Sequence, residues 1–152
     1  MLFSGAKAQP LLPNASLTPG ATNGLPVEIT SAHGYTPTVR NVPEKLKRQV
    51  FIEYFGKVPA KTSDYEVDHL ISLELGGSNS ISNLWPQSYL TFPYNAHVKD
   101  KLENYMARSV RAMLAERGHD SATTLLYGYQ QEIATNWIVA YEKYLGTNSI
   151  KK

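Results

Sequence analysis

Residues 67–87, VDHLISLELGGSNSISNLWPQ, constrain the fold more than any other part of the chain. The first half of the segment is rich in apolar and β-branched residues, and Gly76 and Gly77, with the Ser and Asn after them, are typical of a turn. The second half is short and reaches Pro86, a residue that seldom lies in the middle of a sheet. The pattern predicts a β-hairpin over residues 65–86.

Helical periodicity dominates the rest of the chain. Apolar residues recur at spacings of three and four in three further stretches, and each stretch is followed by a glycine. This pattern predicts helices over residues 43–55, 94–117 and 122–145. A hairpin followed by a long helix, with helices on either side in the sequence, indicates an α+β fold that is mostly helical.

The length and composition are those of one domain. With 152 residues and 42% hydrophobic content, the chain can bury a core of its own. Residues 9–26 are rich in Pro, Asn, Thr and Gly without any period, so we expect an extended or disordered arm over residues 1–26 before a single domain at residues 27–152. The chain contains no Cys, which excludes disulfides and thiolate zinc sites, and its net charge of +2 is compatible with an anionic partner.

The first residues resemble the end of a secretory signal peptide. Ala6-Lys7-Ala8 has the small-x-small form of a cleavage site, so residues 1–8 would be a signal remnant and the protein secreted or periplasmic. The apolar stretch before it is short, and the alternative is a cytoplasmic protein with an irregular N-terminus. No apolar run in the sequence approaches the roughly 20 residues of a membrane span, so no membrane partner is expected.

Polar residues stand at three junctions of the predicted hairpin and the helix after it. Asp68 and His69 lie on the first strand, Asn83 opens the second strand and Asn95 begins the helix. Each has an ordinary structural explanation when taken alone, since Asn is common in turns and at helix starts. Neighbours on a regular strand face opposite sides, so Asp68 and His69 can share a site only where the strand twists, bulges or ends. We predict such a distortion.

Helix phase separates the polar residues at the start of the helix. With successive residues about 100° apart, Asn95 falls near the centre of the inward stripe, and His97 falls on the opposite side. Lys99 flanks the inward stripe, where it could meet a phosphate. The stripe itself is formed by Val98, Leu102, Tyr105, Met106, Ser109 and Met113.

This combination of residues resembles the HNH nucleases. Their ββα-metal motif carries Asp-His on the first strand, an Asn near the second strand and an Asn or His early in the following helix. The runs YEVDHLISLELGGSNSISNLWPQ and NAHVKDKLE look like a bacterial subfamily of HNH endonuclease-like proteins, and Arg40-Asn41-Val42-Pro43 matches the R-x-V-P segment of that subfamily. The likeness covers residues 65–103, about a quarter of the chain.

The resemblance implies a role for each junction residue. His69 would be the general base that deprotonates a water molecule, and Asn83 would hold the His69 side chain in the right orientation. Asp68 and Asn95 would be the two protein ligands of one divalent metal ion. A carboxylate and an amide oxygen form a hard ligand pair, which favours Mg²⁺, with Mn²⁺ as the alternative.

Four further residues remain as candidates around this site. His97 is the alternative to Asn95 as a metal ligand, because many HNH proteins carry a His there. Glu66 shares a strand face with Asp68, and it is an accessory ligand or a solvated side chain. Arg40 and Lys99 are the candidates for binding phosphate.

The expected function is a metal-dependent endonuclease, an enzyme that hydrolyses phosphodiester bonds of nucleic acid. DNA is the expected substrate and RNA the alternative, with low sequence specificity because no recognition module beyond the motif is visible. Two other functions stay open. One is a nucleic-acid-binding protein that keeps the HNH scaffold without catalysis, and the other is a toxin-type nuclease effector.

Overall fold

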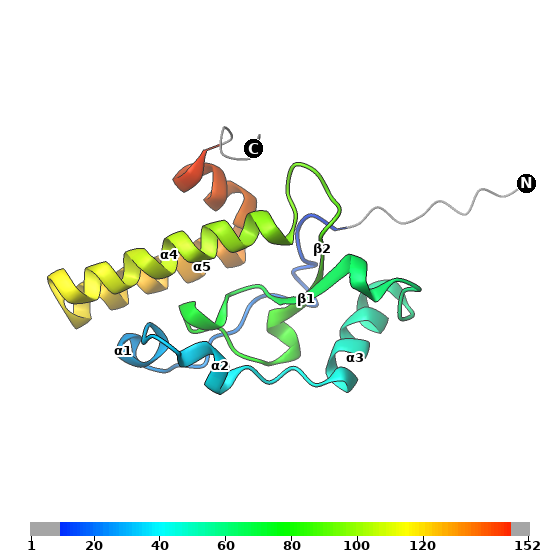
Figure 1. Ribbon diagram of the computed structural model, residues 1–152, viewed down its shortest axis with the longest axis horizontal. Helices are drawn as coiled ribbons and strands as arrows, with labels where there is room; N and C mark the ends of the chain where they lie inside the picture. The colour runs from blue at the N-terminus through cyan, green and yellow to red at the C-terminus, as the bar shows by residue number, and fades with distance from the viewer. Residues whose placement is uncertain (1–9, 147–152) are drawn as a thin grey trace, which may run out of the picture.

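Two antiparallel strands lie between one helix and a pair of long helices (Figure 1). The computed structural model describes residues 10–146, and its fold is mixed α+β. The strands are β1 (Tyr65–His69) and β2 (Leu84–Ser88), and α3 (Glu44–Phe55) packs against β2. The long pair, α4 (Ala96–Arg117) and α5 (His119–Leu145), forms the other side.

The three predicted helices are confirmed with small shifts of their first residues. α3, α4 and α5 all end where the sequence predicts, each before a glycine, while α5 begins three residues earlier than expected. Asn136 breaks α5 internally, because its backbone is extended and its Oδ1 accepts from the N–H groups of Ile138 and Val139, at 3.0 and 3.1 Å. Two short helices, α1 (Val27–Thr30) and α2 (Tyr35–Val39), were not predicted, because so few residues show no periodicity.

The antiparallel pairing of the predicted hairpin is confirmed, with His69 opposite Leu84 and Tyr65 opposite Ser88. The connection is longer than a hairpin turn. β1 ends at His69, and the loop that follows contains the 3₁₀ helices η2 (Leu73–Leu75) and η3 (Ile81–Asn83). Gly77 closes this loop on itself, since a Cβ at this position would lie 1.7 Å from the carbonyl oxygen of Ile71. Only glycine permits so close an approach.

The part of the N-terminal arm that the structure describes, residues 10–26, is hydrogen-bonded to the β1–β2 loop. Backbone N–H groups of Gly20 and Asn23 donate to the carbonyl oxygens of Ser82 and Gly76, at 3.0 and 2.9 Å. The indole of Trp137 on α5 donates to the carbonyl oxygen of Leu11. The arm thereby restrains the loop that shapes the site. Residues 1–8, where the signal remnant was predicted, lie outside the described residues.

The core lies where α4 and α5 face each other and the β1–β2 loop. Its fully buried members from the long helices include Leu102, Met106, Ile133, Trp137 and Tyr141. The loop contributes Leu70 and Leu75, and β2 contributes Trp85. In residues 10–146, every helix is too short or too polar to cross a membrane.

Candidate active site

A polar pocket of about 250 Å³ opens where β1 ends. Asp68 and His69 both line it, although they are neighbours on a strand, because the strand stops at His69. The predicted distortion is therefore confirmed, and it takes the form of a strand end. Further walls come from Arg40, Glu66, Ser72, Glu74, Asp100 and Glu103.

The tautomer of His69 follows from the contacts of Asn79. The Nε2 atom of His69 lies 3.0 Å from Oδ1 of Asn79. That amide has one orientation only, because its Nδ2 donates to the carbonyl oxygen of Val39 at 2.8 Å and its Oδ1 accepts from the N–H of Asn41 at 3.2 Å. An accepting Oδ1 requires a proton on Nε2, so the lone pair of a neutral imidazole is on Nδ1.

The neutral imidazole is also the favoured charge state. His69 is 2% exposed, and burial lowers its pKa, while the hydrogen bond to Asn79 and the charge of Asp68 raise it by less. A neutral His69 with an unprotonated Nδ1 can accept a proton at neutral pH.

Asn79 therefore makes the hydrogen bond to His69 that we predicted for Asn83. We expected Asn83 to orient His69, but its amide is fully buried and bonds to the loop backbone instead. It accepts from the N–H groups of Ile71 and Ala21 and donates to the carbonyl oxygens of Ile71 and Ser78, at 2.9 to 3.3 Å. Asn79 was missed because an Asn after Gly-Gly-Ser is explained by the turn alone.

Asn83→Asp should destabilise the fold strongly. The carboxylate cannot donate, so the carbonyl oxygens of Ile71 and Ser78 would lose their partner, and a charge would be buried. Each unsatisfied buried group costs about 1–3 kcal/mol, so we expect a loss of at least about 2 kcal/mol. Urea denaturation measures the change, with the exposed Asn41→Asp as the matched control. Equal stability of the two variants would contradict the structural role of Asn83.

Lys99 is buried rather than available to a phosphate, which corrects the prediction for this residue. Its ammonium group donates to Oδ2 of Asp68 at 2.7 Å, to the carbonyl oxygen of His69 at 2.9 Å and to the carboxylate of Glu103. These three bonds use all of its protons. Burial lowers the pKa of Lys99, but the carboxylates of Asp68 and Glu103 outweigh burial and raise it. Lys99 therefore stays charged and joins the end of β1 to α4.

Asn95 also differs from its predicted position in the site. It is the N-cap of α4, where its Oδ1 accepts from the N–H of Val98 and its Nδ2 donates to the carbonyl oxygen of Thr91, both at 3.1 Å. Neither Asn95 nor His97 lines the pocket, and the His97 ring lies 4.9 Å from the Tyr89 ring. Helix phase places Asn95 inward, but an Asn at a helix start satisfies the first backbone N–H groups instead of a metal.

Acidic side chains outnumber cationic side chains in the lining of the pocket. Burial raises the pKa of Glu66 to about 7, with Asp68 and Asp100 adding to the shift. Burial and the charge of Asp68 also raise the pKa of Asp100. The guanidinium of Arg40 lines the pocket and makes no hydrogen bond or ion pair within residues 10–146. The pocket therefore has hard oxygen donors and one cation that remains available to an anion.

The residues that could hold a divalent metal ion differ from the predicted pair of ligands. Glu66 and Asp68 alternate along β1, share a face and both line the pocket, so their carboxylates replace the pair of Asp68 and Asn95. Residues 10–146 contain no group of three His, Cys, Asp or Glu side chains placed to hold one ion. The Oγ of Ser72, a further pocket residue, is buried without a hydrogen-bond partner in the same range. Two carboxylates suit Mg²⁺, which keeps several of its waters.

Comparison with known proteins gives no match to a family model, to a curated protein or to a solved structure. The functional argument therefore depends on the geometry of this pocket.

Proposed function

We propose that the protein is a metal-dependent endonuclease of the HNH type, which hydrolyses phosphodiester bonds of DNA, with RNA as the alternative substrate. One observation carries the proposal. A neutral His69, held by Asn79 in the tautomer with Nδ1 unprotonated, lines the same pocket as two carboxylates and a free Arg40. A base, hard oxygen donors and a cation are what phosphodiester hydrolysis requires in one place.

In this proposal Nδ1 of His69 removes a proton from the attacking water. The imidazolium that forms keeps its Nε2–H bonded to Oδ1 of Asn79, which holds the ring in place during the transfer. Asp68 lies beside the ring and favours the positive charge. Arg40 is free to bind a phosphate oxygen and orient the scissile group. General-base help of this kind is typically worth about 10² to 10⁴ in rate.

Glu66 and Asp68 are the residues that would hold Mg²⁺ or Mn²⁺. Such an ion supplies positive charge for the phosphate oxygens and the leaving group. Asp68 has one carboxylate oxygen left for this role, because Lys99 occupies the other.

A digestion panel tests the proposed activity. Purified protein is incubated with supercoiled plasmid, linear single-stranded DNA and RNA in the presence of Mg²⁺, Mn²⁺ or EDTA. The proposal predicts cleavage with Mg²⁺ or Mn²⁺ that EDTA abolishes. Substrates that stay intact with every divalent ion contradict it.

Metal binding should depend on pH through Glu66. The pKa of Glu66 is about 7, so below that pH a proton competes with the ion for its carboxylate. We expect Mg²⁺ affinity, measured by calorimetry, to rise about tenfold from about pH 6 to about pH 8. Glu66→Gln should weaken binding and remove this dependence. An unchanged pH dependence in Glu66→Gln would exclude Glu66 as a ligand.

The ion pair between Lys99 and Asp68 favours one other function. An ammonium bonded to Asp68 can take the place of a metal ion, as in a nucleic-acid-binding protein that keeps the HNH scaffold without catalysis. The digestion panel separates the two functions, because a binding protein would retain nucleic acid in a gel without cutting it.

A further inference from the structure

A second hollow, a groove of about 600 Å³, lies between α3 and β1. Arg40 and Glu66 line both this groove and the pocket at His69, so the two hollows adjoin at these side chains. Neither the predicted site nor the proposed mechanism uses the far end of the groove. A chain lying in it would reach the His69 pocket at Arg40.

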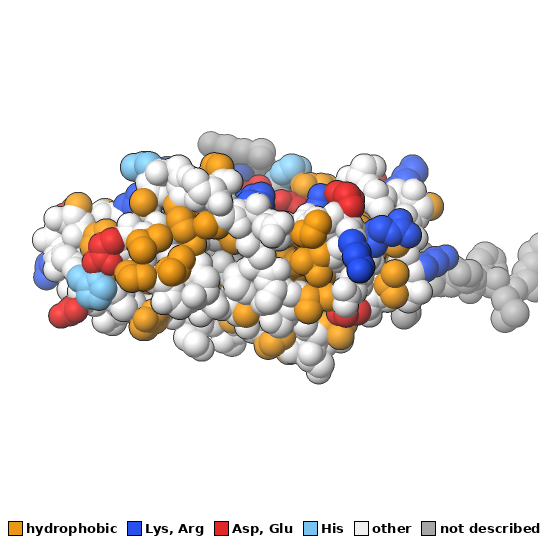
Figure 2. Space-filling view, turned by 90° about the horizontal axis from the view of Figure 1, so that it is seen from below, with side chains coloured by type: hydrophobic (Ala, Val, Ile, Leu, Met, Phe, Trp, Pro, Cys, Tyr) orange, Lys and Arg blue, Asp and Glu red, His pale blue; other side chains and the backbone are white. Residues whose placement is uncertain are grey.

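The groove is cationic along its α3 wall. Arg48 and Lys47 come from α3, and Figure 2 shows Lys and Arg side chains gathered at the end of the molecule where α3 lies. Lys47 pairs with the exposed Glu44 at 2.8 Å, whereas Arg48 and Arg40 make no ion pair within residues 10–146. Two guanidinium groups therefore remain available to an anionic chain, one at the far end and one at the junction with the pocket.

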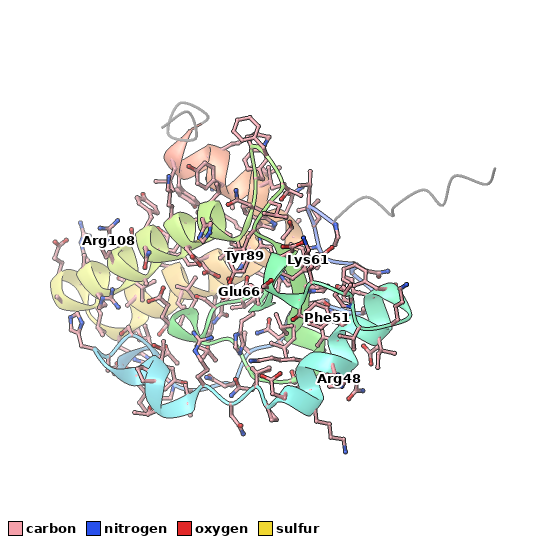
Figure 3. All side chains as sticks on the ribbon, turned by 45° about the vertical axis from the view of Figure 1, so that its right-hand side comes forward. Arg48, Phe51, Lys61, Glu66, Tyr89 and Arg108 are labelled. Atoms are coloured by element: carbon pink, nitrogen blue, oxygen red, sulfur yellow. The ribbon has the colours of Figure 1, made fainter. Side chains whose placement is uncertain are left out.

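Aromatic rings line the same groove. Phe51 and Tyr65 pack edge to face at 6.0 Å and form its floor, and Tyr89 is part-exposed where the groove approaches the pocket. The Tyr89 hydroxyl lowers the pKa of the Glu66 carboxyl, and Figure 3 shows these two side chains close together. Rings beside cations are the pattern by which proteins bind single strands, since an unpaired base exposes a face for stacking.

We propose that this groove binds single-stranded nucleic acid, with phosphates at Arg48 and Arg40 and a base against Tyr89, and leads the strand to His69. This inference rests on the proposed function, because the groove matters as the path to that site. The bases of an intact duplex are stacked on each other and cannot reach Tyr89, so a single strand or an unwound segment is the preferred ligand.

Binding is measured by fluorescence anisotropy with a labelled oligothymidine and with a duplex of matched length. EDTA is present throughout, so cleavage cannot occur and the groove is tested separately from the enzyme activity. We expect the wild type to bind the single strand more tightly than the duplex. Arg48→Gln should weaken single-strand binding roughly two- to fivefold. It should also reduce the slope of log affinity against log salt by about 0.7.

Matched variants isolate the two contacts. Arg108→Gln removes an equal charge from an exposed residue on α4, far from Arg48 in Figure 3, and should bind like the wild type. Tyr89→Leu and Tyr89→Phe both lose the hydroxyl, but only the first loses the ring. We expect a loss of about 5- to 150-fold for Tyr89→Leu and recovery with Tyr89→Phe.

Three results would overturn the inference. They are a wild type that binds no oligonucleotide, equal binding of duplex and single strand without any effect of Tyr89→Leu, and displacement by polyglutamate as effective as by unlabelled oligothymidine. Binding as expected without cleavage in the digestion panel would refute the proposed enzyme activity but support the groove as a binding site for single strands. Cleavage whose KM is unchanged in Arg48→Gln and Tyr89→Leu would refute the groove as the binding site but support the proposed enzyme activity.

Discussion

His69→Ala should reduce the single-turnover rate of phosphodiester cleavage by about 10² to 10⁴, because it removes the proposed general base. The carboxylates of Glu66 and Asp68, which share the pocket with His69, are assigned to the metal in this proposal. Labelled substrate at saturating Mg²⁺ gives the rate. His69 is buried, so thermal denaturation checks the fold, and His69→Gln serves as a second variant that fills more of the space.

Two other variants serve as comparisons for the loss of rate in His69→Ala. Asn79→Ala removes the acceptor for Nε2–H and frees the ring to take the wrong tautomer, and we expect a loss of about tenfold, the worth of one hydrogen bond. His97→Ala should change little, because His97 is exposed and outside the pocket. A cleavage rate that falls with His97→Ala and survives His69→Ala would refute the assignment of the base.

The pH profile of cleavage tests the same assignment of His69 as the general base. Burial lowers the pKa of His69 in the folded protein, so the imidazole gains its inactivating proton only at a pH below the usual value near 6.5. At saturating Mg²⁺ the rate should therefore stay on its plateau through neutral pH and fall on the acid side of about pH 6.5. A fall that begins well above pH 7 would indicate a different base.

Lys99→Met should destabilise the folded protein by about 3–5 kcal/mol, because it leaves the carboxylates of Asp68 and Glu103 buried without their cation. For a chain of this size the melting temperature should fall by roughly 6 to 20 °C. In the wild type the pKa of Lys99 is raised by folding, so its stabilisation is fully present below about pH 10.5. Lys101→Met, an exposed neighbour on α4, is the matched control.

The loss in Lys99→Met should shrink in acid. Burial raises the pKa of Glu103 and Lys99 lowers it, so without Lys99 the carboxyl in the folded state is protonated more readily than in the unfolded chain. The folded variant then gains protons, and hence stability, as the pH falls from neutral toward about 4.5. Adding Glu103→Leu to Lys99→Met should restore part of the stability. Equal melting temperatures for Lys99→Met and Lys101→Met would contradict the buried ion pair.

Much of the fold could be predicted because its long elements carry strong periodic signals. The helices that end at Phe55, Arg117 and Leu145 each repeat an apolar stripe over several turns and stop at a glycine. The extent of β1 could not be predicted in the same way. Its apolar residues continue to Leu75, but the loop buries them in η2, and tertiary packing rather than strand pairing uses them.

The pocket that we propose as the active site could be located from the sequence, but its contacts could be predicted only in part. The adjacent Asp68 and His69 located it, since a strand end is the geometry that lets both line one pocket. Three amides were harder to separate, because Asn79, Asn83 and Asn95 all occupy places where Asn is common for local reasons. Which amide orients the imidazole, which holds the loop and which caps the helix depends on contacts across the fold. The burial of Lys99 likewise depends on Asp68, which is distant in the sequence.

The proposed catalysis requires that His69 be neutral, protonated on Nε2 and unprotonated on Nδ1 at neutral pH. Long-range ¹H–¹⁵N NMR of protein labelled with ¹⁵N-histidine measures this directly. We expect a protonated-type shift for Nε2 and an unprotonated-type shift for Nδ1, with both moving toward the usual tautomer mixture in Asn79→Ala. A proton on Nδ1, or an imidazolium at neutral pH, would refute His69 as the general base, because Nδ1 would then have no lone pair with which to activate water.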